Sequence, residues 1–263
     1  MPELPDVEVF KNYLTSTSLH QTVTNIDIRD AGMLSGVSPQ RLKKELTGSR
    51  FVSGRRHGKH LFVNADNDRW LMFHFGMTGY LKYYKHKEQE PDHSRLLFLF
   101  DNRYHLAYHC QRKLGWISLI KDPQAFVEKQ DLGPDALGEE MNPDRLAYIM
   151  NKSRATVKSL LMNQSKIAGI GNIYSDEILF QAGIDPRTKS NRLGNKRIQR
   201  LHEAMKMVLA ESIQAKADPA RLPANFLIPH RHKEGKCPGC RGVVKKITVS
   251  GRSGYYCPHC QNR

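Results

Sequence analysis

The chain has 263 residues, of which 39% are hydrophobic, and this is enough apolar material for one large folded domain or two ordinary ones. Its 41 Lys and Arg against 26 Asp and Glu give a formal net charge of +15, which favours a polyanionic partner, although a merely soluble basic protein has the same composition. No apolar run is as long as a membrane span, and no charged and apolar leader precedes a cleavage site. We therefore expect a cytoplasmic, nucleoid-associated protein with no membrane partner.

Helical spacing at the start of the chain gives way to short strands. Pro5 suits a first helical turn, and Val7, Phe10 and Leu14 repeat at helical spacing. Short segments typical of strands follow, most of them bounded by turn formers, at residues 23–28, 59–63, 69–75, 79–84, 95–100, 104–109 and 115–120. This spacing predicts a β-sandwich or a barrel.

The pattern changes near residue 130. Residues 131–145 are rich in turn formers, and Pro143 suits the first turn of a helix, after which the chain is mostly helical as far as Pro223. Two apolar helical faces are predicted, one of Val157, Leu160 and Leu161 and the other of Ile198, Leu201, Met205, Val208 and Ser212. Between them, two glycines interrupt the helical pattern, which is typical of a helix-turn-helix arrangement.

Four of the five cysteines form two C-x2-C pairs that are sixteen residues apart. This spacing predicts one structural zinc ion with four thiolate ligands, Cys237, Cys240, Cys257 and Cys260. His259 lies within the second pair, but four sulfurs complete the tetrahedron, so we expect this side chain to be exposed. The segment between the pairs reads as two strands with a glycine-rich turn that carries Arg252, a candidate reader of a groove or a phosphate. The fifth cysteine, Cys110, is expected to be a buried thiol without a role.

Two further segments carry candidate chemistry. Gly169 and Gly171 precede Asn172, which opens a helix whose free N–H groups are predicted to offer a phosphate-sized positive end, although an ordinary capped helix accounts for the same residues. At the start of the chain, removal of Met1 would expose Pro2 as a secondary amine with a pKa of roughly 8, which can attack a carbon and form an iminium. Glu3 could shuttle the proton, although many helices begin with Pro and Glu.

Five segments together resemble formamidopyrimidine-DNA glycosylase and its relative endonuclease VIII: MPELPDVE, RRHGKHLFV, FHFGMTG, GIGNIYSDE and SGRSGYYCPHCQ. The resemblance implies an α+β protein with an N-terminal β-sandwich and flanking helices in residues 1–130. A helix-two-turns-helix domain in residues 131–225 and a zinc-ribbon finger in residues 226–263 would follow. It further implies a monomer that binds double-stranded DNA in the cleft between its two domains, removes oxidised or ring-opened bases, and cleaves the abasic site by β/δ-elimination.

The resemblance also implies roles for individual residues. Pro2 corresponds to the Schiff-base nucleophile and Glu3 to the acid that assists base departure and sugar-ring opening. Lys59 corresponds to the lysine for β-elimination and phosphate contact, and Arg252 to the phosphate-gripping arginine of δ-elimination, with Asn172 in the same grip. Further DNA contacts are expected from a wedge of Met77, Arg112 and Leu114, and from His74, His93, Lys113 and Arg154 along the backbone.

The sequence departs from the family pattern in two places. Leu114 stands where an aromatic wedge residue is expected, and the segment between Ala217 and Cys237 is too short for the glycine-rich loop that covers a flipped purine. We therefore expect activity on abasic sites, ring-opened purines or oxidised pyrimidines to equal or exceed activity on 8-oxoguanine.

A second hypothesis is a zinc-ribbon protein that binds damaged or bent DNA without catalysis. In that case the same residues recognise the DNA only. Borohydride trapping on abasic DNA separates the enzyme from the binding protein, because the enzyme alone gives a covalent adduct.

Overall fold

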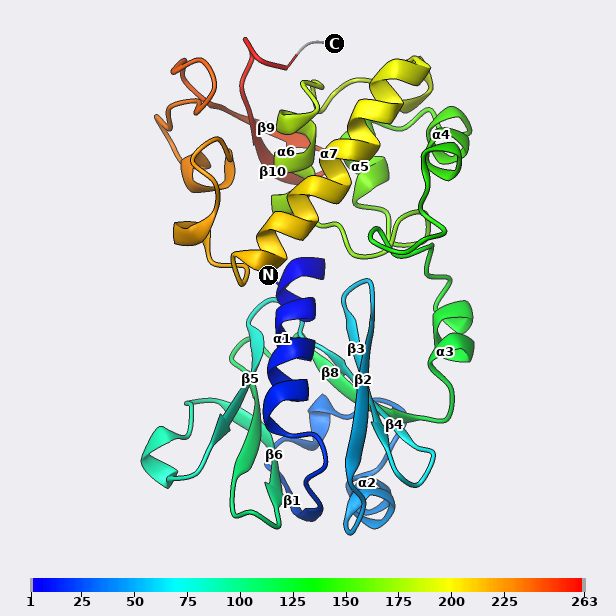
Figure 1. Cartoon of the computed structure of the whole chain (residues 1–263), viewed down its shortest axis with the longest axis vertical. Helices are drawn as coiled ribbons and strands as arrows, with labels where there is room; N and C mark the ends of the chain where they lie inside the picture. Colours follow the sequence, from blue (N-terminus) through cyan, green and yellow to red (C-terminus); the bar gives the residue numbers. More distant parts are fainter. Residues whose placement is uncertain (1, 262–263) are drawn as a thin grey trace. The chain divides into compact units, whose positions relative to one another are not determined.

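The computed structural model describes residues 2–261, which form two compact units (Figure 1). The first unit contains Pro2 and Asp6–Gln130, and the second contains Glu3–Pro5 together with the chain from Asp131 onward. The peptide bond between Pro2 and Glu3 therefore joins residues of different units.

The first unit is built on two four-stranded antiparallel sheets, with strand orders β1-β6-β7-β5 and β2-β3-β4-β8. Inward-facing residues of both sheets share one apolar core, so the architecture is the predicted sandwich rather than a barrel. The strands are β1 (Val23–Ile28), β2 (Phe51–His57), β3 (His60–Ala65), β4 (Trp70–His74), β5 (Gly79–Tyr84), β6 (Ser94–Phe100), β7 (His105–Cys110) and β8 (Trp116–Ile120).

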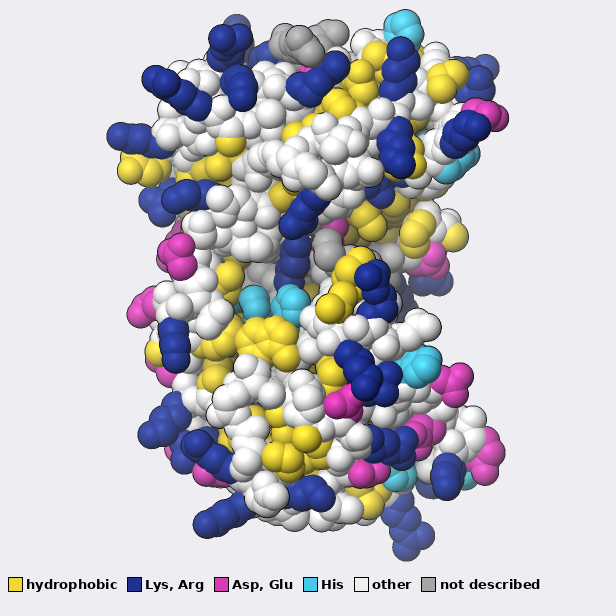
Figure 2. Space-filling model, turned by 180° about the vertical axis from the view of Figure 1, so that it is seen from behind, with side chains coloured by type: hydrophobic (Ala, Val, Ile, Leu, Met, Phe, Trp, Pro, Cys, Tyr) yellow, Lys and Arg dark blue, Asp and Glu magenta, His cyan; other side chains and the backbone are white. Residues whose placement is uncertain are grey.

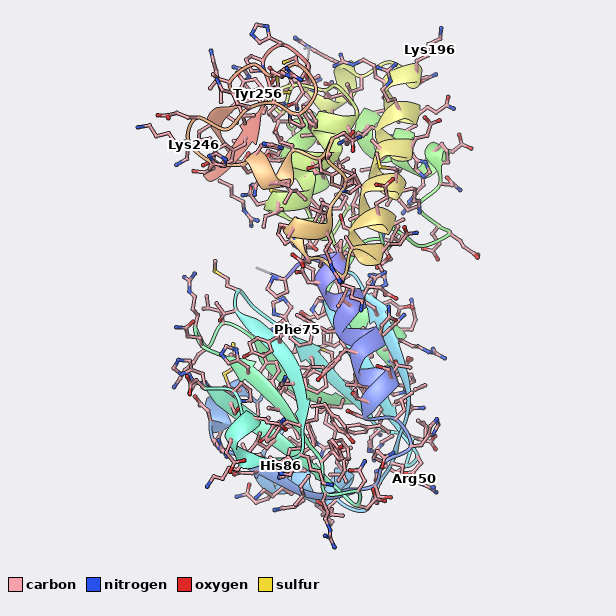
Figure 3. The ribbon with its side chains drawn as sticks, turned by 60° about the vertical axis from the view of Figure 1, so that its left-hand side comes forward. Arg50, Phe75, His86, Lys196, Lys246 and Tyr256 are labelled. Carbon is pink, nitrogen blue, oxygen red and sulfur yellow. The ribbon has the colours of Figure 1, made fainter. Side chains whose placement is uncertain are left out.

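Helix α1 (Leu4–Thr17) packs along two edge strands, one from each sheet. The Tyr13 hydroxyl accepts a hydrogen bond from the backbone N–H of Tyr83 in β5 at 2.8 Å. A Cβ added at Gly54 in β2 would lie 3.4 Å from side-chain atoms of Lys11 and Thr15. Phe75, which is labelled in Figure 3, packs against Phe10 of the helix with ring centroids 4.7 Å apart. The helix therefore covers edges that would otherwise expose unpaired backbone.

Two helices and one strand of this unit were not predicted. Helix α2 (Pro39–Leu46) begins at the Ser38 N-cap, whose hydroxyl accepts the Arg41 N–H, and α3 (Pro123–Lys129) follows Asp122 in the same way. Both carry a serine or aspartate followed by proline, which is a recognisable helix start. Strand β2 contains a glycine and two arginines, so it lacks the apolar pattern from which a strand is predicted. The short 3₁₀ turns are η1 (Ala31–Met33) and η2 (Lys87–Gln89).

The second unit packs four helices around one core and carries a β-hairpin at its C-terminal end. Every residue of the two predicted apolar helical faces is buried. The elements are α4 (Pro143–Asn151), α5 (Val157–Leu161), α6 (Asn172–Gln181), α7 (Asn195–Gln214), η3 (Ser190–Arg192), η4 (Pro219–Arg221), η5 (Ile228–His230), β9 (Lys245–Val249) and β10 (Arg252–Tyr256). Within residues 2–261, no helix has the length and apolar character needed to cross a bilayer.

Candidate active site and zinc centre

The carboxylate of Glu3 occupies the N-terminal end of α6. Its Oε2 accepts the N–H groups of Gly171 and Tyr174 at 2.7 and 3.2 Å, and its Oε1 accepts the Ile173 N–H at 2.9 Å. The side chain is fully buried, and the positive end of the helix dipole favours a carboxylate there. Of the two interpretations of this segment, the three bonds to Glu3 agree with a capped helix, and a phosphate would have to displace the carboxylate to use the same N–H groups.

Glycines make room for this segment of the chain. A Cβ at Gly171 would lie 2.4 Å from Cδ of Glu3, and one at Gly169, whose φ is +111°, would lie 2.6 Å from Cδ1 of Leu4. The Leu4 N–H donates to the Gly169 carbonyl at 3.0 Å. Gln164, which the sequence did not single out, orders the loop by accepting the Gly169 N–H and donating to the Ile170 carbonyl. The loop is thus shaped to hold Glu3 in one orientation.

Pro2 and Lys59 belong to the first unit. Pro2 is partly exposed, whereas Met1 lies outside the residues that the structure describes, so its removal stays a prediction. Lys59 occupies the two-residue turn between β2 and β3, where Gly58 has a φ of +55°. Glycine at the first position of such a turn fits the twist of a hairpin. The hairpin therefore presents Lys59 at its tip.

His74 forms a pair with His60 on neighbouring strands, with ring centroids 5.2 Å apart. Burial, followed by the nearby positive charges, lowers the pKa of His60 to about 3 and that of His74 to about 4, and Lys59 contributes to both shifts. The Nδ1 atoms of both rings are buried and have no hydrogen-bond partner among residues 2–261. At neutral pH, His74 of the protein without DNA is therefore uncharged.

The predicted wedge residues lie on two loops that pack together. Met77 and Leu114 are large apolar side chains that are 37% and 51% exposed. Gly76 has a φ of +57°, and a Cβ there would lie 2.4 Å from the backbone carbonyl carbon of Leu114. The Arg112 N–H donates to the Thr78 hydroxyl at 3.1 Å. The structure therefore brings the β4–β5 and β7–β8 loops together, as a joint wedge requires.

The remaining predicted DNA contacts are exposed. His93 and Arg154 lie at the surface, the former with a φ of +57°. Lys113 instead forms an ion pair with Asp30, with Nζ and Oδ2 2.8 Å apart. Hydrogen bonding to Lys113 lowers the pKa of Asp30. Contact of Lys113 with a phosphate would therefore compete with this ion pair.

Asn172 and the tip of the β9–β10 hairpin lie together in the second unit. The Asn172 Nδ2 donates to the Ser253 carbonyl at 2.8 Å, and its Oδ1 is buried without a partner among the described residues. Positive φ angles at Ser250 and Gly251 form the turn, and Arg252 follows with an exposed side chain. Asn172 is therefore bound to the backbone of the residue next to Arg252, and their joint grip on a phosphate stays a prediction.

A buried ion cluster, which sequence reasoning missed, attaches this hairpin to α6. Asp176 accepts Lys158 at 2.5 Å on Oδ1, and on Oδ2 it accepts Arg231 at 2.8 Å and the Tyr255 N–H at 2.9 Å. Lys158 and Asp176 are fully buried. A Cβ at Gly254 would lie 2.7 Å from Oδ1 of Asp176, so the hairpin backbone rests directly on the cluster.

The segment from Ala217 to Cys237 packs against the second unit at its middle. Phe226 and Leu227 are buried, and the Ile228 N–H donates to Oε2 of Glu177 at 2.8 Å. Burial raises the pKa of Glu177 to about 7. These contacts hold the middle of the segment against the second unit, whereas residues 218–221 and 232–234 are exposed.

The four predicted zinc ligands converge at the base of the hairpin. All their sulfur atoms lie within 4.8 Å of one another, with Cys237–Cys260 and Cys240–Cys257 Sγ separations of 3.7 and 3.5 Å. A tetrahedron with Zn–S bonds of about 2.3 Å has sulfur–sulfur edges of about 3.8 Å, so the ligands fit zinc. Gln261 accepts the Cys257 N–H and donates to the Ile184 carbonyl, each at 2.8 Å, which anchors the second cysteine pair. His259 is exposed, as predicted.

Comparison with known proteins covers nearly the whole chain. The family model for the formamidopyrimidine-DNA glycosylase N-terminal domain matches residues 1–117, the H2TH domain model of the same proteins matches residues 132–223, and a model of the zinc finger found in FPG and IleRS matches residues 235–263. A formamidopyrimidine-DNA glycosylase of Syntrophomonas wolfei is 36% identical over 275 residues, which cover 99% of this chain and 100% of the relative. The chain belongs to the formamidopyrimidine-DNA glycosylase family.

Solved structures of the same family are similar along the full chain. A Lactococcus lactis formamidopyrimidine-DNA glycosylase bound non-covalently to DNA with an AP site has a TM-score of 0.90 at 28% identity, with 99% of this chain and 100% of that chain covered. A second L. lactis structure, with Fapy-dG DNA, has a TM-score of 0.88 at 28% identity and the same coverage. The predicted family, fold class, enzyme class (a bifunctional glycosylase and AP lyase acting on damaged DNA) and zinc centre are therefore confirmed.

Positive charge is spread over the glycosylase surface. Figure 2 shows Lys and Arg side chains over the visible face of the second unit, with few acidic side chains among them. Most of the net charge of +15 comes from this part of the sequence. Such a surface attracts a polyanion independently of sequence.

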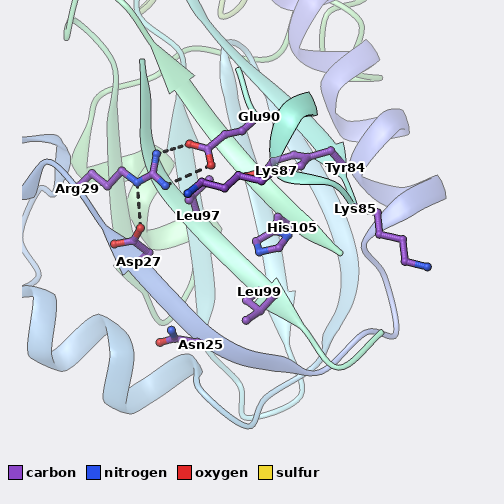
Figure 4. Close-up of a pocket in the computed structure, with 10 residues that line it drawn as sticks. All are labelled: Asn25, Asp27, Arg29, Tyr84, Lys85, Lys87, Glu90, Leu97, Leu99 and His105. Carbon is purple, nitrogen blue, oxygen red and sulfur yellow. Dashed lines mark hydrogen bonds and ion pairs between the residues drawn. The ribbon is translucent and has the colours of Figure 1, made fainter. Parts of the chain in front are cut away.

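A separate pocket of about 350 Å³ lies on the sheet β1-β6-β7-β5 (Figure 4). Its charged side chains largely bind one another: Arg29 donates to Asp27 at 2.9 Å and also to Glu90. The pocket contains none of the predicted site residues, and we assign it no role in DNA repair.

Proposed function

We propose that this member of the family removes oxidised or ring-opened bases with the N-terminal amine of Pro2 as nucleophile. The observation that carries the proposal is the Glu3 carboxyl group, which α6 holds by three N–H groups beside Pro2 in the sequence. Base excision needs a carboxyl group next to the nucleophile, because charge develops on the sugar while the leaving base must gain a proton. Rigid positioning of that group favours catalysis.

The chemistry follows in two stages. The Pro2 nitrogen attacks C1′ and the bond from C1′ to the base breaks, while Glu3 relays the proton that the nitrogen loses to the departing base. The bond from C1′ to the ring oxygen then breaks, the ring oxygen takes up a proton from solvent through Glu3, and the nitrogen lone pair forms an iminium between Pro2 and C1′. The iminium acidifies the neighbouring C2′ position, so loss of a C2′ proton expels the 3′ phosphate by β-elimination, and a second elimination at the 5′ side gives the δ product.

Phosphate contacts are assigned to Lys59 in the first unit and to Asn172 and Arg252 in the second. Lys59 at the hairpin tip supports β-elimination, and Arg252 supports the δ step. The bond from Asn172 to the Ser253 carbonyl supports a joint grip, since it ties the amide to the backbone beside Arg252. Contacts to phosphates position the DNA strand, and the cations Lys59 and Arg252 neutralise the phosphate charge.

The partner is double-stranded DNA that contains a damaged base or an abasic site. The target base must leave the stack before C1′ can be attacked, and Met77, Arg112 and Leu114 fill the gap. His74, His93, Lys113 and Arg154 contact the backbone. The protein acts as a monomer in the cytoplasm at the nucleoid. Its domains are residues 1–130, 131–225 and 226–263, and the division after Gln130 supports the first boundary, although Glu3–Pro5 belong to the second unit.

Borohydride trapping tests the proposal. Mature protein incubated with abasic DNA and borohydride should give a covalent adduct, and peptide mapping should place it on Pro2. Pro2→Gly should retain part of the activity because a free amine remains, whereas Glu3→Gln should abolish base excision and leave DNA binding largely intact. An adduct on an internal lysine would contradict the mechanism, and DNA binding without any adduct would favour the binding protein without catalysis.

A further inference from the structure

Glu8 lies in the first motif of the chain, MPELPDVE, yet the proposed chemistry gives it no part. Its Oε2 accepts a hydrogen bond from Nε of Arg56 at 2.8 Å, and Lys11 binds its other oxygen. The side chains of Glu8 and Arg56 are only 17% and 8% exposed. An ion pair shielded to this degree is better protected from solvent and salt than a surface pair.

Arg56 makes a second contact, with the turn that carries Lys59. Its Nη1 donates to the carbonyl oxygen of Gly58 at 3.1 Å, while its backbone belongs to β2, where it pairs with Leu61 of β3. One guanidinium therefore binds helix α1 through Glu8 and the hairpin turn through Gly58. A guanidinium suits this task, because its donors are fixed in one plane and can serve two acceptors at once.

The packing around the pair leaves the hairpin close to the helix. Gly54 of β2 faces Lys11 and Thr15 of α1, and a Cβ there would already lie 3.4 Å from both. The side of the hairpin is thus held by packing, and Arg56 binds its tip through the Gly58 carbonyl. Loss of the guanidinium would remove this contact with the turn and leave the strands paired.

We propose that Glu8 and Arg56 are positioning residues that fix the Lys59 turn relative to helix α1, and so support the elimination step more than the formation of the Schiff base. The inference rests on the proposed role of Lys59. It differs from that role because neither Glu8 nor Arg56 needs to touch DNA.

Single-turnover cleavage of DNA with a preformed abasic site tests the pair, with borohydride trapping of the same samples. Arg56→Gln and Glu8→Gln should each slow strand cleavage about tenfold or more, while the trapped fraction stays close to that of the wild type. The double variant should be no slower than the slower single variant, because both changes break one interaction. Arg56→Lys keeps the charge but not the two-way fork, and should fall between Arg56→Gln and the wild type.

Arg69→Gln is the matched control, because Arg69 donates to Glu45 at 2.8 Å in the same unit without contacting the turn. It should cleave within about twofold of the wild type. Equal slowing by Arg69→Gln, or equal loss of trapping and cleavage in Arg56→Gln and Glu8→Gln, would overturn the inference and indicate a general loss of structure. Lys59→Ala distinguishes failure of the positioning role from failure of the proposed role of Lys59. If Lys59→Ala is slow and Arg56→Gln is not, the positioning role fails alone; if Lys59→Ala cleaves normally, the proposed role of Lys59 fails and the inference fails with it.

Discussion

Gly171→Ala should displace the Glu3 carboxylate from the end of α6. The new Cβ would lie 2.5 Å from Oε1 and 2.4 Å from Cδ, so the carboxylate must retreat by about 1 Å to reach an ordinary contact of 3.4 Å. The three N–H bonds are 2.7, 2.9 and 3.2 Å long, and at least two of them cannot survive that shift. The Gly171 carbonyl accepts the Ser175 N–H at 3.0 Å within α6, so we expect the end of the Glu3 side chain to move rather than the helix backbone.

The magnitude follows from the number of bonds lost. A hydrogen bond to a charged group contributes about 1.5–3 kcal/mol, so losing two costs about 3–6 kcal/mol, and water entering the site brings the expected value to the lower end. Misplacement of a reacting group by about 1 Å can slow a reaction about 10²-fold. We therefore expect a free energy of unfolding about 3 kcal/mol lower, and base excision about 100-fold slower.

Urea unfolding followed by circular dichroism, and single-turnover excision on a ring-opened purine, measure the two effects. Gly194→Ala is the control, because Gly194 is the N-cap of α7, has a φ of −72° and has no atom within 4 Å of an added Cβ. Alanine there should cost only about 1 kcal/mol or less. Excision by Gly171→Ala within threefold of the wild type, with an unchanged unfolding midpoint, would refute the reasoning.

Four further outcomes are expected. Chelation of zinc from the four cysteines should weaken DNA binding, because the metal supplies the folding energy of the small ribbon, and native protein with less than about half an equivalent of zinc would exclude this centre. The pKa values of His60 and His74 lie below the ordinary value of 6.5, so the unfolded chain takes up protons before the folded chain does as the pH falls. The free energy of unfolding should therefore be highest above about pH 6.5 and drop by about 2 kcal/mol per histidine at pH 5. A variant with glutamine at both positions should show a weaker dependence of the free energy of unfolding on pH. Asp30→Ala should release Lys113 and tighten DNA binding at low salt, and an unchanged affinity would show that Lys113 does not contact the phosphates. Activity on abasic sites, ring-opened purines or oxidised pyrimidines should equal or exceed activity on 8-oxoguanine, with weak opposite-base selectivity because Leu114 has no π-face; faster excision of 8-oxoguanine opposite cytosine than of every oxidised pyrimidine would reverse this view.

Local patterns predicted most of the elements. The spacing of the cysteines predicts the metal centre. Apolar residues at alternating or helical spacing predict the strands of the sandwich and the two apolar helical faces. Each of these signals can be read locally because it depends on residues that are near neighbours in the chain. Strand β2 could not be predicted in this way, because its sequence FVSGRRH lacks a regular apolar pattern. Helix α2 does carry a local signal, since Ser38 followed by Pro39 is typical of a helix start.

Contacts between residues far apart in the sequence could not be predicted in the same way. Glu3 lies 168 residues before Gly171, and nothing local to either residue indicates that one carboxylate fills the end of the other's helix. The same holds for Asp176, whose partners Lys158, Arg231 and Tyr255 come from three separate segments. Burial of a charge becomes favourable only when all its partners converge, and this is a property of the folded chain.

The binding of Glu3 to the end of α6 also affects how the second unit would behave if it were produced alone. A fragment that starts at Asp131 would contain the four helices and the zinc ribbon, but it would lack Leu4 of the helical core. Helix α6 would also have lost the carboxylate that binds the N–H groups of Gly171, Ile173 and Tyr174. Those donors would then be open to solvent, and small anions such as formate or acetate should bind there and stabilise the fragment. The first few residues of the chain thus act as a built-in ligand of the domain that begins more than a hundred residues later.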